Sequence, residues 1–382
     1  MGALYLKTHK SDRGGEMNKK LWVAVLAGAF LMIFTVGTYA ESPPWGDAAG
    51  AVYTMTNDAT GNEVVVFTRD EDGILTKAGS VATGGPGFGS ALDPLGSQGS
   101  LALSQDHRWL LAVNAGSNEI SVFKVRPDGL DFVDKVGSGG ALPVSVTIFH
   151  DLVYVLNAGA SPNITGFYLS HKGELVPLNH STRSLGTGGF AEVGFDPFGE
   201  TLVVTDKADN KILVFSLDDE GLPSMNPVTS TSNGNTPFGF IFDQWGHLLV
   251  VEAGSNAVSS YKILHNDTLQ VISPSVANGQ AAACWIAGNE RGYVFTDNPG
   301  SGTISNYKLT DKKGDLVLLN GAAGSGNKPL DVAIAADGRF LYALDPAGGG
   351  VDMFEIQPDG TLTNLGSAAG GLSIFAQGIA AR

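Results

Sequence analysis

Residues 110–125 read LLAVNAGSNEISVFKV, and residues 248–263 read LLVVEAGSNAVSSYKI. Asn114 and Glu252 hold the same place in the two stretches, 138 residues apart, which is three steps of 46. Two further copies lie between them, so the chain contains a repeat of about 46 residues. Such a period is typical of architectures that stack one small structural unit on the next, and the fold prediction starts from it.

Each repeat predicts four strands. A short apolar strand is followed by a turn and by a second strand that ends in Asn, Asp or Glu, which we call the corner residue. A small-residue turn leads to a third strand ending in an aromatic residue, and a polar turn leads to a weaker fourth strand. The third strands alternate in polarity, which predicts half-buried strands. The seven corner residues are Asn57, Asn114, Asn157, Asp206, Glu252, Asp297 and Asp345.

Seven repeats of four strands predict an all-β fold, a seven-bladed β-propeller over residues 51–382. The chain contains no Trp-Asp dipeptide, which excludes the WD40 type. The first repeat begins directly with its second strand near Ala51, so its inner strand must come from elsewhere. We expect residues 377–381 at the C-terminus to supply it, because joining the two chain ends in one blade removes an unpaired edge.

The composition fits this fold and narrows the classes of partner. The 382 residues include 52 glycines and only 16% charged residues, as expected for short strands joined by tight turns. The formal net charge of −15 predicts a surface that repels nucleic acid and anionic lipid. Cys284 is the only cysteine, so no internal disulfide is expected. We expect a monomer without a nucleic-acid partner.

Residues 1–40 have the pattern of an upstream extension followed by a secretory signal peptide. Two lysines precede the apolar run 21–36, and a small-x-small cleavage signal ends at Ala40. The natural start is either Met1 or Met17. Cleavage would leave residues 41–50 as a linker, change the net charge to −18, and place the protein in the periplasm or outside the cell without a membrane contact. The alternative is an uncleaved membrane anchor, for which the apolar run is short.

Three stretches resemble blades of the lactonase-family propellers, namely residues 101–123, 236–263 and 283–309. That family includes bacterial 6-phosphogluconolactonase and the fungal carboxymuconate cyclases. The resemblance covers residues 50–382 and implies a lactone hydrolase or a lactone-ring cyclase. Enzymes of the family carry His and Arg where inner strands begin, whereas the matching place in the fourth blade of this chain reads Phe190-Ala191-Glu192. This departure puts the activity, but not the fold, in doubt.

The residue that begins each inner strand should face the central channel, on the same side of the propeller as the corner residues. These seven residues are Ser100, Ser145, Glu192, Gly239, Cys284, Asp331 and Gln377. Phe238 and Trp285 lie beside them in the sequence. The residues that we expect to contribute to ligand binding are Ser100, Ser145, Phe238, Cys284, Trp285 and Gln377.

Glu192 and Asp331 are the candidate catalytic residues. They lie three blades apart in a ring of seven, so they should face each other across the channel. Two carboxyl groups so placed could activate a water molecule and protonate a leaving oxygen, or hold a metal ion. The alternative is that both are solvated acids that keep the channel mouth from associating with other surfaces.

Four acidic corner residues are candidate ligands for Ca²⁺ or another divalent metal, because such ions prefer carboxylate oxygens. They are Asp206, Glu252, Asp297 and Asp345. The alternative role is structural, since Asn and Asp side chains at turns bind nearby backbone amides, and it accounts for all seven corners.

Histidine and cysteine chemistry is not indicated. Six histidines follow residue 40, and we expect them on the exposed surface because none has zinc-site spacing. They are His107, His150, His171, His180, His247 and His265. Cys284 has no histidine near it in the sequence and is expected to be a small buried residue rather than a nucleophile.

Two functions remain open from the sequence. The first is an exported enzyme that hydrolyses a lactone, and the second is a non-catalytic propeller that binds a small molecule, glycan or protein on its acidic channel face. The insertion GGPGFGSALDPLGSQG at residues 84–99 enters this face just before Ser100. An ordered lid there would favour a small-molecule pocket, and a disordered loop would favour a protein-binding surface.

Overall fold

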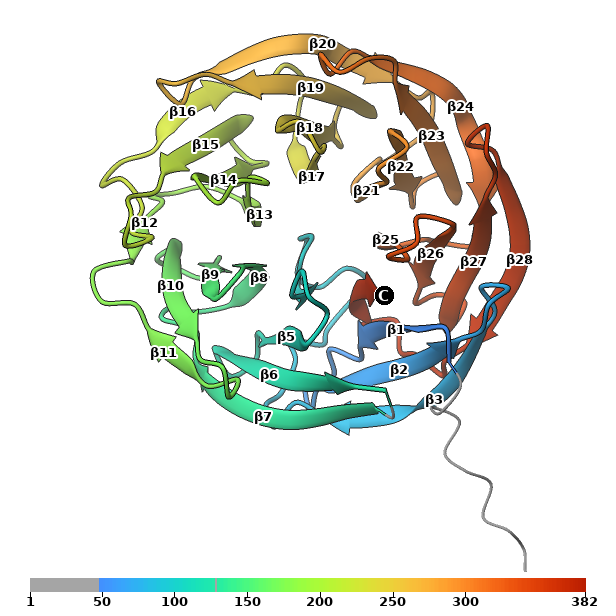
Figure 1. The fold of residues 1–382 in the computed structure, drawn as a ribbon, viewed down its shortest axis with the longest axis horizontal. Helices are drawn as coiled ribbons and strands as arrows, with labels where there is room; N and C mark the ends of the chain where they lie inside the picture. Colours follow the sequence, from blue (N-terminus) through green and yellow to red (C-terminus); the bar gives the residue numbers. More distant parts are fainter. Residues whose placement is uncertain (1–47, 128) are drawn as a thin grey trace, which may run out of the picture. The chain divides into compact units, whose positions relative to one another are not determined.

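The computed structural model describes residues 48–127 and 129–382. These residues form seven antiparallel sheets arranged as a closed ring, and Figure 1 looks down its axis. The predicted all-β, seven-bladed propeller is therefore confirmed. The predicted leader at 1–40 and most of the predicted linker lie outside the described residues. No helix in the described part of the chain is long and apolar enough to cross a membrane.

Each blade runs from an inner strand beside the channel to an outer strand at the rim. From inside to outside, blade 1 contains β29 (Gln377–Ala381), β1 (Gly50–Met55), β2 (Glu63–Arg69) and β3 (Leu75–Ala82). Blade 2 contains β4 (Leu101–Leu103), β5 (Trp109–Asn114), β6 (Glu119–Arg126) and β7 (Gly129–Gly137). Blade 3 contains β8 (Pro143–Phe149), β9 (Leu152–Asn157), β10 (Asn163–Leu169) and β11 (Leu175–Pro177), with β12 (Arg183–Ser184) also paired to β10.

The other four blades each have four strands. Blade 4 contains β13 (Phe190–Phe195), β14 (Thr201–Asp206), β15 (Lys211–Ser216) and β16 (Val228–Thr231), and blade 5 contains β17 (Pro237–Phe242), β18 (His247–Glu252), β19 (Ala257–Ile263) and β20 (Leu269–Ala277). Blade 6 contains β21 (Ile286–Gly288), β22 (Tyr293–Asn298), β23 (Thr303–Leu309) and β24 (Leu316–Ser325), and blade 7 contains β25 (Val332–Ile334), β26 (Phe340–Asp345), β27 (Gly350–Ile356) and β28 (Leu362–Ala369).

The core lies between the blades. Second strands such as β5 and β14 are buried along their whole length, because each sheet packs against a neighbour on both of its faces. For the same reason the predicted half-burial of the third strands is wrong: in β2 every residue after Glu63 is buried. The aromatic residue near the end of each third strand is buried in every blade, at Phe67, Phe123, Phe167, Phe215, Tyr261, Tyr307 and Phe354.

The C-terminal strand closes the ring as predicted. β29 pairs antiparallel with β1, with Tyr53 opposite Ala380 and Thr54 opposite Ile379. Ile379 and Ala380 are buried, and Figure 1 places the C-terminus beside β1. Blade 1 is thus assembled from the two ends of the described chain.

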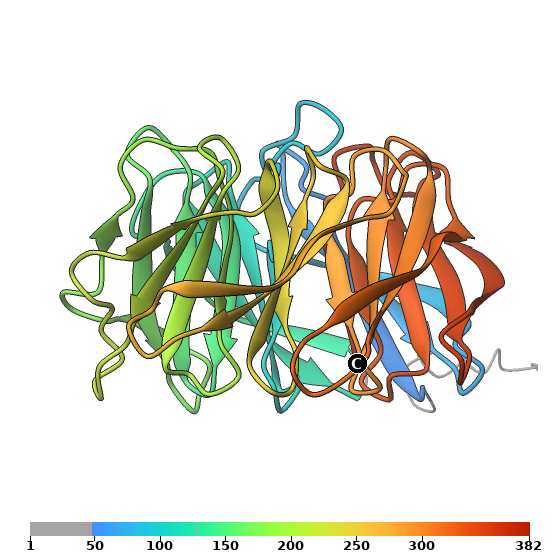
Figure 2. The ribbon, with the colours of Figure 1, turned by 90° about the horizontal axis from the view of Figure 1, so that it is seen from above.

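The ring has two faces, which Figure 2 shows in side view. The turns between second and third strands, and the connections from each fourth strand to the next blade, lie on one face, which we call the channel face. The remaining turns lie on what we call the opposite face. This division follows from the antiparallel order of the strands in every blade. The connection from β3 to β4 extends beyond the other loops of the channel face (Figure 2).

Candidate functional site

The seven residues predicted to begin the inner strands lie within these strands or one or two residues before them, in a ring around the channel axis. All are buried except Cys284, which is partly buried. Each blade bonds to the next one at this level: the Val193 N–H donates to Ser145 Oγ at 3.2 Å, and the Gly239 N–H donates to the Cys284 carbonyl at 3.1 Å. The structure therefore brings the predicted channel residues together, and the hydroxyl of Ser100 has no hydrogen-bond partner among the described residues.

The insertion predicted at residues 84–99 enters this ring. Its last part, residues 93–99, which we call the plug, bonds to the inner strands of several blades. The Gln98 N–H donates to the Ala191 carbonyl at 3.2 Å. The Gln98 side chain accepts from the Ile286 N–H at 3.0 Å and donates to the Ile286 carbonyl at 3.2 Å. These bonds hold the plug against the inner strands of blades 4 and 6 on the channel face.

Two predicted binding residues form hydrogen bonds with the plug. The Gln377 side chain accepts from the Leu95 N–H at 3.1 Å and donates to the Asp93 carboxylate at 2.8 Å. The Trp285 indole N–H donates to the Ser97 carbonyl at 2.8 Å. Polar groups that the sequence assigned to a ligand are thus satisfied within the chain.

Gly239 is the one glycine in the ring, and the plug explains it. A Cβ atom at this position would lie 2.1 Å from the Gln98 side-chain oxygen and 2.9 Å from the Cys284 carbonyl oxygen. Any larger residue would displace the plug. The inner strand of blade 5 is therefore shaped to accept Gln98.

The candidate catalytic carboxyl groups are both buried beside the plug. Glu192 is 8% exposed and Asp331 is 4% exposed. Glu192 accepts a hydrogen bond from the Phe240 N–H at 2.6 Å, and Asp331 accepts one from the Val332 N–H at 2.9 Å. Burial raises the pKa of both carboxyl groups well above the ordinary value, and the charge of Asp331 raises the pKa of Glu192 further.

Asp331 also has a strained backbone. Its φ of 101° lies in the region that side chains other than glycine rarely adopt. Such strain costs about 1–3 kcal/mol and persists where the surrounding structure imposes it, often at functional sites. The Asp331 N–H donates to the Asp297 carboxylate at 2.7 Å, which fixes the backbone in this conformation. Packing of the ring does not require an acidic residue with this backbone conformation at a buried position, so Asp331 is the strongest candidate for a functional residue.

Glu192→Gln is expected to change how stability depends on pH. Because the folded-state pKa of Glu192 is raised, its contribution to stability is complete below the ordinary carboxyl pKa and is lost as the pH rises through the raised pKa. Glutamine keeps an acceptor for the Phe240 N–H and removes the ionisation. We expect the variant to melt a few degrees higher than the native protein at pH 8 and at the same temperature at pH 4. If the melting temperatures of the variant and the native protein differ by the same amount at pH 4 and at pH 8, the burial of this carboxyl group is contradicted.

Lys207 is a channel residue that sequence reasoning missed. It follows the corner Asp206 directly, where other repeats place residues such as Ala115 or Ala253. Its ammonium group donates to the Gly96 carbonyl of the plug and lies 5.1 Å from the centre of the Phe238 ring. Burial lowers the pKa of Lys207, while the Asp93 carboxylate counteracts this effect. The sequence did contain one signal for this role, namely a lysine at a position where other repeats have a small residue.

Cys284 lies close to this group but is poorly suited to be a nucleophile. Burial, followed by the charges of Asp297 and Asp93, raises the pKa of its thiol far above the ordinary value. The thiolate, which is the reactive form, is therefore suppressed. Phe238 packs edge-on against Trp285 with ring centres 5.1 Å apart, so these two predicted binding residues form one wall beside the plug.

Each of the four acidic corner residues accepts hydrogen bonds from other groups of the chain. Asp206 accepts from the Gly189 N–H at 2.9 Å, and Asp345 accepts from the Gly348 N–H at 2.9 Å. Glu252 accepts from the Tyr261 hydroxyl at 3.0 Å, and Asp297 accepts from the Trp285 N–H at 3.1 Å. In the described part of the chain no group of three or more His, Cys, Asp and Glu side chains could hold a metal ion. The local turn role describes Asp345, and it describes Asp206 through the Ala208 N–H at 3.1 Å. Glu252 instead binds a side-chain hydroxyl, and Asp297 also accepts from the Asp331 N–H of the next blade.

The expectation that all six histidines are exposed is wrong for His247. It is 8% exposed, and its Nδ1 atom lies 2.8 Å from the Asp243 carboxylate. This turn residue is buried because the neighbouring third-to-fourth-strand turn of blade 6 covers it: a Cβ at Gly314 would lie 2.8 Å from the His247 ring. His150, His171, His180 and His265 are exposed, and His107 is partly exposed.

Comparison with known structures shows the same fold. A protein from Lactobacillus plantarum matches with a TM-score of 0.70 and 17% identity over 87% of this chain and 99% of that chain. A periplasmic gluconolactonase from Pseudomonas aeruginosa matches with a TM-score of 0.69 and 16% identity over 84% and 98%. A provisionally assigned 6-phosphogluconolactonase from Bacteroides fragilis matches with a TM-score of 0.65 and 16% identity over 87% and 98%. At these identities the likeness shows the fold alone.

A family model matches the sequence directly. No curated protein matches the chain by sequence. The model described as "Lactonase, 7-bladed beta-propeller" matches residues 50–187 and 252–369, which include blades on both sides of the ring. The chain therefore belongs to the lactonase family of seven-bladed β-propellers.

Proposed function

We propose that this protein is an exported enzyme that hydrolyses a lactone in the channel, with Glu192 and Asp331 as its acid and base. The observation that carries the proposal is the strained, buried Asp331 within electrostatic reach of a second buried carboxyl group. Family membership and the periplasmic gluconolactonase among the similar structures support lactone chemistry and export.

The two carboxyl groups take different roles because their surroundings differ. The charge of Asp331 raises the pKa of Glu192, so we assign Glu192 as the proton donor and Asp331 as the proton acceptor. Asp331 would accept a proton from a water molecule as its oxygen attacks the lactone carbonyl carbon. Glu192 would donate its proton to the ring oxygen as the bond from the carbonyl carbon to that oxygen breaks. The product is a hydroxy acid, and pairs of carboxyl groups with separated pKa values perform such transfers.

The plug must withdraw for this reaction to occur. In the closed form the plug lies beside both acids: the Gln98 N–H donates to the Ala191 carbonyl next to Glu192, and the charge of Asp93 raises the pKa of Asp331. Loops that open to admit a substrate and then exclude water are common in enzymes. Lys207 would then be free to hold the carboxylate of the product, since in the closed form it donates to the Gly96 carbonyl.

Titration of released acid on a panel of sugar and aliphatic lactones tests the proposal. Glu192→Gln and Asp331→Asn keep the hydrogen-bond acceptors and remove the proton transfers, so each should lower kcat by about 10²-fold or more. Asp209→Asn is the matched control, because this acid lies on the same face and is exposed. Full activity in both channel variants, or no turnover by the folded native protein, would contradict the proposal.

The second candidate function is that of a non-catalytic binding propeller. The plug favours this function. Its residue Gln98 bonds to the inner strand of blade 6, and Trp285 and Gln377 bond to the plug, so these polar groups are already satisfied within the chain. A folded protein that turns over no lactone in the panel would support this function.

A further inference from the structure

The opposite face carries a groove that the proposed reaction does not use. It has a volume of about 1140 Å³ and runs along turns of blades 4, 5 and 6. This exceeds the ~300–1,000 Å³ typical of small-ligand pockets. Its lining includes Phe198, Asp219, Trp245, Lys262, Leu264 and Lys312.

Two aromatic residues take equivalent places in this groove. The first-to-second-strand turns of blades 4 and 5 read DPFGE (196–200) and DQWGH (243–247), with Phe198 and Trp245 before a glycine of positive φ. Phe198 is 57% exposed and Trp245 is 36% exposed. In the corresponding turns of blades 2, 6 and 7, the position before the residue of positive φ is occupied by Asp106, Arg291 and Asp337, respectively. The turn therefore does not need an aromatic residue, and its presence in two adjacent blades calls for another reason.

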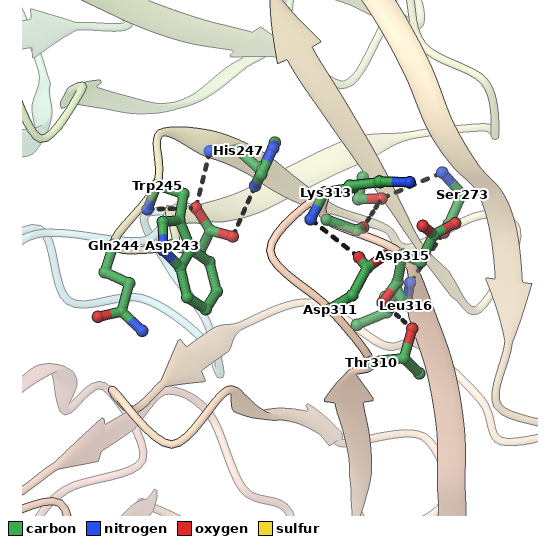
Figure 3. Close-up of polar contacts among 12 residues, drawn as sticks. Asp243, Gln244, Trp245, His247, Ser273, Thr310, Asp311, Lys313, Asp315 and Leu316 are labelled. Carbon is green, nitrogen blue, oxygen red and sulfur yellow. Dashed lines mark hydrogen bonds and ion pairs between the residues drawn. The ribbon is translucent and has the colours of Figure 1, made fainter.

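The turn that presents Trp245 is rigid. Figure 3 shows the Asp243 carboxylate at the centre of this turn. It accepts from the Trp245 N–H at 2.9 Å and from the His247 N–H at 2.8 Å, and its second oxygen lies 2.8 Å from the His247 ring nitrogen. These bonds fix the backbone that carries the indole, so less of this turn has to be ordered when a ligand binds.

The two aromatic side chains belong to one continuous surface. A Cβ at Gly246, the residue after Trp245, would lie 2.8 Å from the edge of the Phe198 ring, so Phe198 reaches across from blade 4 onto the turn of blade 5. The Trp245 indole N–H donates to no partner among the described residues. Together they offer two exposed aromatic rings and an indole N–H donor.

The rest of the lining is polar and carries both signs of charge. Polar and charged side chains outnumber apolar ones, and they include Glu200, Asp219, Lys262 and Asp267. Carboxylates only accept hydrogen bonds and ammonium groups only donate them, so the groove suits a ligand that does both at many points. A protein partner would instead favour a broader apolar patch at the centre of its interface.

We propose that this groove binds a neutral oligosaccharide of equatorially linked pyranose rings, stacked on Trp245 and Phe198. The axial C–H groups of such rings form flat apolar faces that pack on aromatic rings, while their hydroxyl groups donate to Glu200 and Asp219 and accept from Lys262 and Lys312. This site lies on the face opposite to Glu192 and Asp331 and is independent of the proposed lactone chemistry.

Calorimetric titration of the purified full protein with cellohexaose and with chitohexaose tests the inference. We expect saturable binding of at least one of them, weakened about tenfold or more in Trp245→Ala and several-fold in Phe198→Ala. Trp245→Phe should bind nearly as well as the native protein, since it keeps a ring face. Phe132→Ala is the matched control, because Phe132 is 45% exposed on the outer strand β7, away from the groove.

A fluorescence measurement locates the binding. Trp109 and Trp285 are buried, whereas Trp22 and Trp45 lie outside the described residues and are replaced by Phe for this measurement. Acrylamide quenching then reports mainly on Trp245. Bound saccharide should protect this residue. Absence of binding by both saccharides, or binding that Trp245→Ala and Phe198→Ala leave unchanged, would overturn the proposal. So would self-association of the native protein that Trp245→Ala abolishes, because the groove would then be a contact between two copies.

Discussion

Deleting residues 377–382 is expected to leave a chain that does not hold its fold at 37 °C. The deletion removes β29, the inner strand of blade 1, and exposes the fully buried strand β1 along one edge. It also removes Gln377, which holds the plug by three hydrogen bonds. We expect a loss of about 5 kcal/mol or more, a large share of the ~5–15 kcal/mol by which domains are stable. Thermal melting followed by circular dichroism measures it.

A circular permutant shows whether the loss of stability comes from losing β29 or from changing the position of the chain ends. The Arg382 N–H donates to the Ala51 carbonyl at 2.9 Å, so a short Gly-Ser linker can join residue 382 to residue 48. New ends can be placed between His171 and Lys172, in an exposed turn of blade 3. This permutant keeps β29 and should melt at least as high as the native protein. A truncated chain that melts like the native protein would show that the closure is dispensable.

Replacing the plug is expected to make Cys284 react about 10³-fold faster with N-ethylmaleimide. Residues 139–144 (GGALPV) occupy, before Ser145, the place that residues 84–99 occupy before Ser100, so they are a natural replacement. The graft removes the Gln98 and Ser97 contacts and opens the channel to solvent. The factor corresponds to about 4 kcal/mol of local opening energy, within the range between frayed loops and global unfolding.

The control for this graft is Phe88→Ala. Phe88 belongs to the same connection but is 42% exposed and lies outside the plug. This variant should leave the reaction rate of Cys284 unchanged. If Cys284 of the native protein already reacts with N-ethylmaleimide as fast as an exposed thiol, the plug does not close the channel in solution. A faster thiol together with faster lactone turnover in the graft would agree with the plug acting as a lid.

The sequence was sufficient for the fold because the information about each blade is local. Corner residues such as Asn114 and Glu252, and the aromatic residue that follows them, recur in every repeat and fix strand order and register. The closure by residues 377–381 followed from the missing first strand. The sequence did not predict that both faces of the third strands are buried. An alternating pattern looks the same whether its polar positions contact water or a neighbouring sheet.

The site was less predictable because its geometry depends on contacts between distant blades. The ring positions of Glu192 and Asp331 followed from repeat spacing, but the φ of Asp331 did not, since Asp297 of the preceding blade imposes it. The plug has no periodicity, and its conformation is set by strands of other blades. Lys207 and His247 were missed for the same reason: what buries them is remote in sequence.

The joining of both chain ends in blade 1 has a consequence for biosynthesis. Strand β1 is made early, yet its inner neighbour β29 begins at Gln377, after more than 300 further residues have been added. At about 5–20 residues per second, ribosomal synthesis leaves β1 without this partner for roughly 15–65 s. During that time its edge can pair with any other extended chain. The nascent protein is therefore expected to depend on chaperones that shield this edge until β29 has been made.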